Sequence, residues 1–191
     1  MAKVLTFSRT YPSYHPRKGE QTFFVQKIWN NILKGGNTSY YEICSLNNGL
    51  DNGRTLWDFW MSIKEDEITE SKGHTIRASH RFKVGDKFSP RIWSGKPYCS
   101  KQIIIAPDIE VKKVWNFEIK NEFQGDGFYN FFYLDGIFQS WKEMEEISKH
   151  DGLELEDFVH WFKANDGYFS GEEYTCSFDG QIICWDESIN Y

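Results

Sequence analysis

Eight basic residues and a single acid lie between residues 72 and 101 of a chain whose net charge is −6. This window carries +7, so the rest of the chain carries −13. It opens with KGHTIRA, in which Lys72, His74, Thr75 and Arg77 stand close together. A basic zone in an acidic protein indicates a local anionic partner, although a solvated strand-and-loop region would carry the same charges. Because the whole chain is acidic, a mononucleotide or a short single strand fits better than a long duplex.

A loop in the same window carries side chains suited to a single strand. Trp93 and Tyr98 flank the segment SGKP, and an exposed ring there can stack on a base. Core packing is the more common fate of a tryptophan such as Trp93, whereas the environment of Tyr98 is left open. Lys96 and Lys101 are expected to meet phosphate, so binding would weaken with salt.

The composition limits the class of protein. A chain of 191 residues fits one domain and is long enough to bury a core. Hydrophobic residues make up 40% and aromatic residues 18%, which excludes global disorder. No run of about 18 consecutive apolar residues occurs, so no membrane span is expected. Residues 1–16 lack the apolar run of a signal peptide, and we expect a cytoplasmic protein.

The cysteine spacing argues against a structural metal site. No two of the four cysteines form a C-x-x-C pair, which disfavours zinc. We expect four free thiols, in keeping with a reducing compartment, and neither a metal nor a cofactor. The four are Cys44, Cys99, Cys176 and Cys184.

The elements that position the basic residues can be predicted from hydrophobic periodicity. Residues 3–7 fit a short strand, and residues 22–36 fit a helix with apolar side chains at i, i+4 and i+8. Residues 37–71 form an excursion, with a strand expected at 40–44 and a helix at 55–63. Strand patterns separated by glycine and proline turns then follow at 74–78, 87–93, 101–106 and 109–119.

Two Asp-Gly pairs predict hairpins in the second half of the chain. They occupy residues 135–136 and 179–180, and each lies between strand-like segments. Such a pair supplies the positive φ angles that a two-residue hairpin loop needs. Hairpins are therefore expected over 130–139 and 174–185.

The helices between these hairpins complete the predicted fold. Ser140 and Glu143 form a capping box that opens a helix ending near Gly152, and another helix follows at 153–162. Strands dominate the chain and helices lie near both ends, so the class is α+β. Short strands separated by turns favour a small barrel with flanking helices over a parallel sheet.

Four segments resemble the ASCH domains of the PUA-like superfamily, and in particular the small bacterial N4-acetylcytidine amidohydrolases. These segments are TFF at 22–24, KGHTIR at 72–77 with FKVGD at 82–86, KHDGLELEDF at 149–158, and FDGQIICW at 178–185. They occur in the order of the family, although each is a common pattern by itself. The resemblance implies one PUA-like (ASCH) β-barrel domain over 1–191, with an insertion at about 37–71.

The same resemblance implies catalytic roles for three residues. Thr75 would be the nucleophile, Lys72 the base that activates it, and Asp151 the proton donor to the leaving amine of a cytidine. A threonine hydroxyl needs an adjacent base, and a lysine serves if burial or nearby positive charge lowers its pKa. Arg77 and His74 could help to keep Lys72 neutral. The family uses glutamate where this chain has Asp151, and a shift of about 1 Å in such a group can cost ~100-fold in rate.

Each of these residues also has a purely structural interpretation. Thr75 is β-branched and suits a half-buried strand, and Lys72 could be a solvated charge. Asp151 lies at the end of one predicted helix and just before the next, where an acid is favoured by the second helix dipole. Arg77 could anchor a phosphate or a strand-end salt bridge.

Three functions remain open from the sequence. The first is recognition of a nucleobase or modified nucleoside in a basic pocket around Lys72, Thr75 and Arg77, with hydrolysis of an N-acyl amide on cytidine as its sharpest form. The second is a non-catalytic RNA-binding module that binds short single-stranded RNA. The third is a protein-interaction role for the aromatic insertion at 37–71. The sequence does not indicate an oligomeric state.

Overall fold

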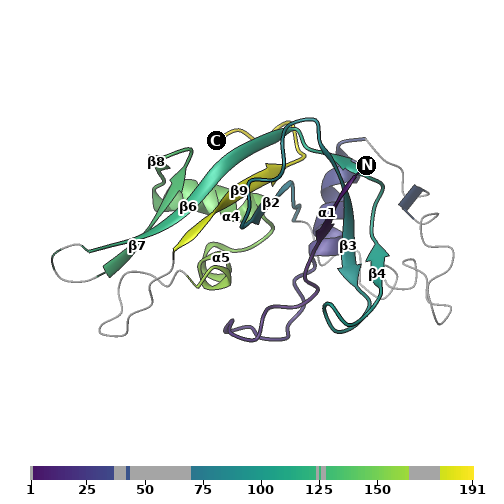
Figure 1. The fold of residues 1–191 in the computed structure, drawn as a ribbon, viewed down its shortest axis with the longest axis horizontal. Coiled ribbons are helices and arrows are strands. Elements are labelled where there is room, and N and C mark those ends of the chain that lie inside the picture. The colour runs from purple at the N-terminus through teal and green to yellow at the C-terminus, as the bar shows by residue number, and fades with distance from the viewer. Residues whose placement is uncertain (1, 37–41, 44–69, 124, 126–127, 164–176) are drawn as a thin grey trace.

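The computed structural model describes residues 2–36, 42–43, 70–123, 125, 128–163 and 177–191. Its strands form two sheets, with helices packed beside them, which confirms the α+β class (Figure 1). In the described part of the chain neither sheet closes on itself, so the single closed barrel that was expected is not formed. The predictions for 44–63 lie outside the described residues. Glu42 and Ile43, predicted as strand, are helical.

The first sheet is built around β3. Strand β1 (Lys3–Thr6) runs parallel to β3 (Lys87–Trp93), with Lys3 opposite Phe88. Strands β4 (Gln102–Ile104) and β5 (Ile109–Glu110) pair with β3 in the antiparallel sense. The single strand predicted over 109–119 is therefore divided, because its first two residues join this sheet and the rest joins the other.

The second sheet has the order β2-β9-β6-β7-β8, and all its pairs are antiparallel. Its Asp135-Gly136 turn has φ angles of 48° and 79°, as the predicted hairpin requires. The hairpin over 130–139 is thus confirmed. The strands are β2 (His74–Arg77), β6 (Lys113–Phe123), β7 (Phe128–Leu134), β8 (Ile137–Phe138) and β9 (Phe178–Cys184).

The hairpin predicted around residues 179–180 is wrong. Strand β9 runs straight through Asp179 and Gly180, which lie opposite Glu118 and Phe117 of β6. Gly180 is needed there for a different reason. A Cβ atom on Gly180 would lie 2.2 Å from the carbonyl oxygen of Arg77. The glycine thus permits close approach of two backbones, which is the other common use of glycine inside a strand.

Gly180→Ala is therefore expected to lower the free energy of unfolding by about 3 kcal/mol, because β2 must move away from β9 to admit the methyl group. Denaturant unfolding measures the loss. Gly95→Ala is the matched control, since a Cβ at Gly95 would only reach ordinary contact with Ser100 at 3.6 Å. The interpretation is wrong if the two substitutions have equal effects.

Three helices were predicted close to their observed bounds. They are α1 (Phe24–Lys34), α4 (Trp141–His150) and α5 (Leu155–Trp161). The predicted capping box opens α4, where the Ser140 hydroxyl accepts from the Glu143 amide and the Glu143 carboxylate accepts from the Ser140 amide. A tight turn joins α4 to α5, since Gly152 has a φ of 78°. No helix in the described residues is long and apolar enough to cross a membrane.

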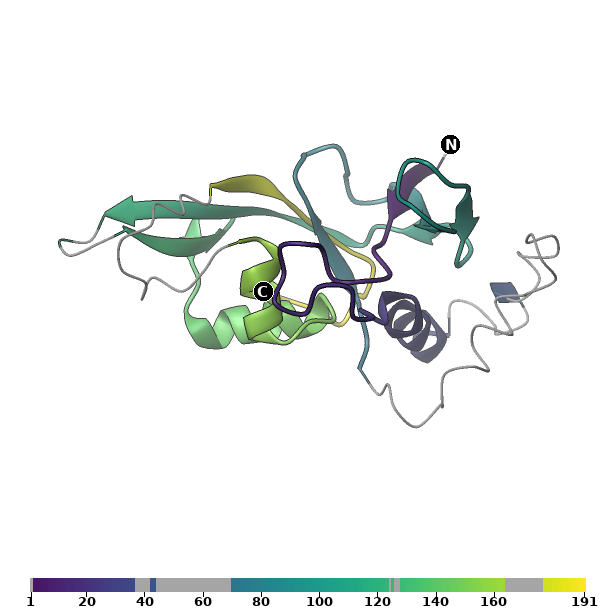
Figure 2. The same cartoon turned by 90° about the horizontal axis from the view of Figure 1, so that it is seen from below.

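Beside β2, a side chain joins the two sheets. Among the described residues, no backbone strand pairing joins them there. Arg77 Nη2 donates to the carbonyl oxygen of Thr6 at 2.8 Å, and its guanidinium lies 5.3 Å from the centre of the Phe7 ring. Figure 2 shows β2 running between the half of the molecule that contains β1 and the half that contains α4 and α5.

Candidate functional site

The structure brings Lys72 and Asp151 together, although 79 positions separate them in the sequence. Lys72 lies two residues before the start of β2, and Asp151 is the C-cap residue of α4. Lys72 Nζ donates to Asp151 Oδ1 at 2.7 Å and also to the carbonyl oxygen of Asp151. The Lys72 side chain is only 1% exposed, so the solvated role considered for it does not apply. The ammonium group therefore pairs with the carboxylate and also caps the α4 C-terminus.

Backbone hydrogen bonds hold the Lys72-Gly73 segment on both sides. The Lys72 amide donates to Lys27 O of α1 at 2.9 Å, and the Gly73 amide donates to His150 O at 3.0 Å. Gly73 O in turn accepts from the Trp185 amide at 3.0 Å. Since α1, α4 and β9 each contribute a bond, the position of Lys72 is fixed by elements from three parts of the chain.

Burial makes both charges of the pair costly. Burial lowers the pKa of Lys72 to about 8, with Arg77 and Lys27 acting in the same direction, while Asp151 opposes the shift. Burial raises the pKa of Asp151, opposed by Lys72, by Arg77 and by a hydrogen bond from the Ile76 amide. The pKa values of the base and the acid thus move toward each other, which is the condition for exchange of a proton between them.

His74 packs against α4 as a neutral ring. Its Nε2 lies 3.0 Å from Ile147 O, and because a carbonyl can only accept, Nε2 carries the proton. Its Nδ1 lies 3.4 Å from the Tyr191 hydroxyl. Burial and the nearby Lys72 lower the pKa of His74 well below its usual value. The structure therefore places His74 beside Asp151, at 4.0 Å, where its polar atoms already have partners.

Thr75 and Arg77 lie on the opposite face of β2 from His74, because side chains alternate along a strand. Thr75 pairs with Ile183 of β9 and is 2% exposed. Burial lowers the pKa of Arg77, whereas the Asp151 carboxyl and the Tyr98 phenol act to raise it. Arg77 therefore lies within electrostatic reach of both the Asp151 pair and the loop that carries Tyr98.

The other predicted contact residues lie in the loop between β3 and β4 or, for Trp93, at the end of β3. Tyr98 is 88% exposed, and its backbone has a φ of 64°. Its ring lies 5.4 Å from that of Trp93, which is half-buried and not a core residue. Lys96 and Lys101 are both exposed. These side chains form a surface separate from the buried Lys72–Asp151 pair.

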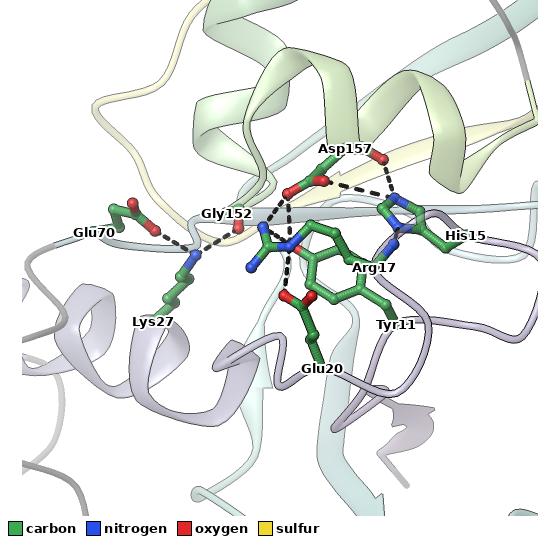
Figure 3. Close-up of polar contacts among 8 residues, drawn as sticks. All are labelled: Tyr11, His15, Arg17, Glu20, Lys27, Glu70, Gly152 and Asp157. Atoms are coloured by element: carbon green, nitrogen blue, oxygen red, sulfur yellow. Dashed lines mark hydrogen bonds and ion pairs between the residues drawn. The ribbon is translucent and has the colours of Figure 1, made fainter.

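Sequence reasoning missed Lys27, which lies next to the pair. Lys27 Nζ donates to Gly152 O at 2.9 Å and forms an ion pair with Glu70 (Figure 3). The turn after α4 is thus capped by two lysines, and a Cβ on Gly152 would lie 3.2 Å from Lys27 Cδ. The helical spacing could have indicated that Lys27 is buried, because a lysine three residues after Phe24 falls on the apolar stripe of α1.

A second network, also missed, fastens the loop between β1 and α1 to α5 (Figures 2 and 3). Asp157 accepts hydrogen bonds from the Tyr11 hydroxyl at 2.8 Å and from Arg17 Nη1 at 2.5 Å. His15 Nε2 lies 3.1 Å from Asp157 O, and His15 Nδ1 accepts from the Arg17 amide. No sequence pattern indicated these pairs, because they join a loop without periodicity to a helix 140 residues away.

The cysteines of the described chain are not bridged. Cys99 is exposed and Cys184 is buried, and both are free thiols. Cys44 and Cys176 lie outside the described residues. Within the described ranges, no cluster of three or more His, Cys, Asp or Glu side chains is arranged to hold a metal ion.

Comparisons with known proteins give no further information about this site. No model of a protein family matches the chain, and neither the curated proteins nor the solved structures include a match.

Proposed function

We propose that this chain recognises a modified nucleoside beside β2 and hydrolyses an N-acyl amide on its cytosine-type base. The observation that carries the proposal is the buried Lys72–Asp151 contact, in which a lysine with a pKa of about 8 touches a carboxyl whose pKa is raised. Thr75 is three residues from that lysine, as in the ASCH amidohydrolases that the motif resembles. On this proposal the two sheets represent a PUA-like arrangement that is open at β2.

The Lys72–Asp151 pair can supply both proton transfers of an amide hydrolysis. A shift of one proton from Lys72 to Asp151 produces a neutral amine and a neutral acid with no change in net charge. Thr75 Oγ1 then attacks the acyl carbon while its proton passes to Lys72 Nζ. The C–N bond breaks, and the Asp151 proton goes to the leaving exocyclic amine.

Water completes the cycle on the acyl-threonine ester. The water molecule attacks the ester carbon and gives a proton to the Asp151 carboxylate. The C–O bond to Thr75 then breaks, and Lys72 returns a proton to Thr75 Oγ1. The acid leaves, and the pair again holds one proton, so every atom and charge is restored.

The short side chain of Asp151 suits its position. The family uses glutamate at this place, and a missing methylene would be expected to shorten the reach of the carboxylate. Asp151 nevertheless reaches Lys72 Nζ at 2.7 Å, because it lies at the end of α4 next to the start of β2. The substitution therefore supports proton exchange with Lys72 in this chain.

The direct test uses chromatography to measure the release of cytidine from N4-acetylcytidine. Lys72 and Thr75 are 1% and 2% exposed, so the proposed reaction requires the protein to open and admit the substrate. Turnover that requires the folded protein supports the proposal. If N4-acetylcytidine and other N-acylated pyrimidines bind but are not hydrolysed, the site is a binding module.

A second candidate function, binding of short single-stranded RNA, is favoured by the exposed Tyr98 beside Lys96. A strand that meets about four cations should bind with a log–log salt slope of about −3. Lys96→Ala is expected to reduce that slope by about 0.7, because one phosphate contact is lost. Fluorescence anisotropy with an oligouridine measures it, and Lys149→Ala on the exposed face of α4 is the control. An affinity that does not depend on salt would argue against this function.

A further inference from the structure

The indole of Trp185 has a buried donor without an acceptor. Trp185 is 5% exposed, and its Nε1–H meets no hydrogen-bond acceptor in the described chain. Buried donors are nearly always satisfied, so an exception calls for an explanation. Trp29 provides the comparison, since it is 2% exposed and its Nε1 donates to Ile105 O at 2.7 Å.

Strand register places Trp185 on the same face of the sheet as Thr75. The Trp185 amide bonds to Gly73 O, which extends the β2–β9 ladder by one residue. Thr75 pairs with Ile183, so Trp185 is its diagonal neighbour. Diagonal neighbours on one face lie about 7–8 Å apart, within reach of an aromatic side chain.

The ring of Trp185 lies between the two sheets. Its ring packs against Phe7, which follows β1, with 6.3 Å between ring centres, and against Phe88 of β3, with 5.5 Å. The Arg77 guanidinium lies over the same Phe7 ring, 5.3 Å from its centre. Thr75, Trp185 and Arg77 thus share one face of the second sheet, opposite the first sheet.

We propose that Trp185 Nε1–H binds the acyl carbonyl oxygen of the substrate and stabilises the negative charge that develops on it when Thr75 attacks. This inference rests on the proposed function and identifies the part of an N-acyl nucleobase that the site recognises. Indole N–H can only donate, so its partner must be an oxygen or nitrogen acceptor. The oxygen bonded to the attacked carbon is the acceptor that must lie beside Thr75.

The proposal also accounts for the missing acceptor. A donor aimed at a developing oxyanion has no partner until the substrate is present, and preorganised donors of this kind are the main electrostatic contribution in acyl transfer. The charged groups of the proposed site, which are Lys72, Arg77 and Asp151, already have partners within the protein. Trp185 supplies the donor that the proposed reaction otherwise lacks.

The first test compares Trp185→Phe with Trp29→Phe. Trp185→Phe is expected to lower kcat for N4-acetylcytidine by about 10²–10³-fold, the usual loss for an oxyanion donor, with a much smaller change in KM. Its thermal midpoint should fall less than that of Trp29→Phe, because only the latter removes a satisfied hydrogen bond. Trp29→Phe should retain the activity of the wild type. Equal kcat in Trp185→Phe and wild type would overturn the inference and leave the proposed function standing.

The second test does not depend on turnover or on a folded variant. The wild-type chain has eight tryptophans, and the indole ¹H–¹⁵N signal of Trp185 is observed as N4-acetylcytidine is added. A downfield proton shift of that signal, without a comparable shift for Trp29, supports the inference even in the absence of hydrolysis. If hydrolysis proceeds and the Trp185 signal does not move, the inference fails alone. If there is neither hydrolysis nor a shift of the Trp185 signal, both the proposed function and the inference fail.

Discussion

Thr75→Ala is expected to abolish the release of cytidine from N4-acetylcytidine, with a loss of at least about 10⁴-fold, because no other group at the site can form the acyl intermediate. The substitution removes a hydroxyl and one methyl group from a strand residue that is 2% exposed. The backbone pairing of Thr75 with Ile183 does not depend on the side chain. The protein should therefore remain folded, and the loss should appear in kcat.

Thr75→Ser and Thr75→Val distinguish loss of the nucleophile from loss of side-chain packing. Serine keeps the hydroxyl and should retain measurable turnover, whereas valine keeps the shape of threonine but has no nucleophile. Equal thermal midpoints for the valine variant and wild type would show that the site is intact. Full activity in Thr75→Val would exclude Thr75 as the nucleophile, and the proposed mechanism with it.

Local patterns were sufficient for several elements of this fold. The apolar stripe of α1, the Ser140–Glu143 capping box and the Asp135-Gly136 turn each depend on residues that are near one another in sequence. Such patterns predict an element without knowledge of its partners. The α+β class followed from them.

The arrangement of the sheets depended on contacts that no local pattern contains. Asp179-Gly180 has the composition of a hairpin turn, yet it continues β9. The glycine is explained by the Arg77 carbonyl, which approaches Gly180 too closely for any side chain. Lys27 looked like an ordinary helix lysine until the turn at Gly152 was placed beside it. Both contacts involve the backbone of a distant segment, which propensity and periodicity do not report.

Lys72→Met is expected to lower the free energy of unfolding by about 3–5 kcal/mol, because it leaves the buried Asp151 carboxylate without its partner. It also removes the donor that caps the carbonyl of Asp151 at the end of α4. Methionine fills most of the volume of the lysine stem, so the loss reflects charge more than packing. Chemical denaturation at neutral pH measures the difference from wild type.

Two further variants isolate the cause of that loss. Lys149→Met breaks an ion pair with Glu145 at the same 2.7 Å, but both groups are exposed and screened by water, so it should cost far less than Lys72→Met. The double variant Lys72→Met/Asp151→Asn removes both buried charges and should recover much of the stability. A double variant no more stable than Lys72→Met would show that the contact contributes through packing and not through charge.

The dependence of stability on pH should identify the ammonium group of Lys72 directly. Its pKa is about 8 in the folded protein and about 10.5 in the unfolded chain, so the native state releases its proton first as pH rises. Between about pH 8 and 10.5 the unfolded state then binds more protons at this residue, and linkage requires the contribution of Lys72 to stability to increase with pH across this window. Burial raises the pKa of Cys184 to about 11, which acts in the opposite direction above about pH 9, so the comparison with Lys72→Met isolates the contribution of Lys72. Lys72→Met should lack that increase, so the two unfolding curves should diverge above pH 8. Parallel curves from pH 7 to 10 would mean that burial does not depress this pKa, and would remove the basis for assigning Lys72 as a base.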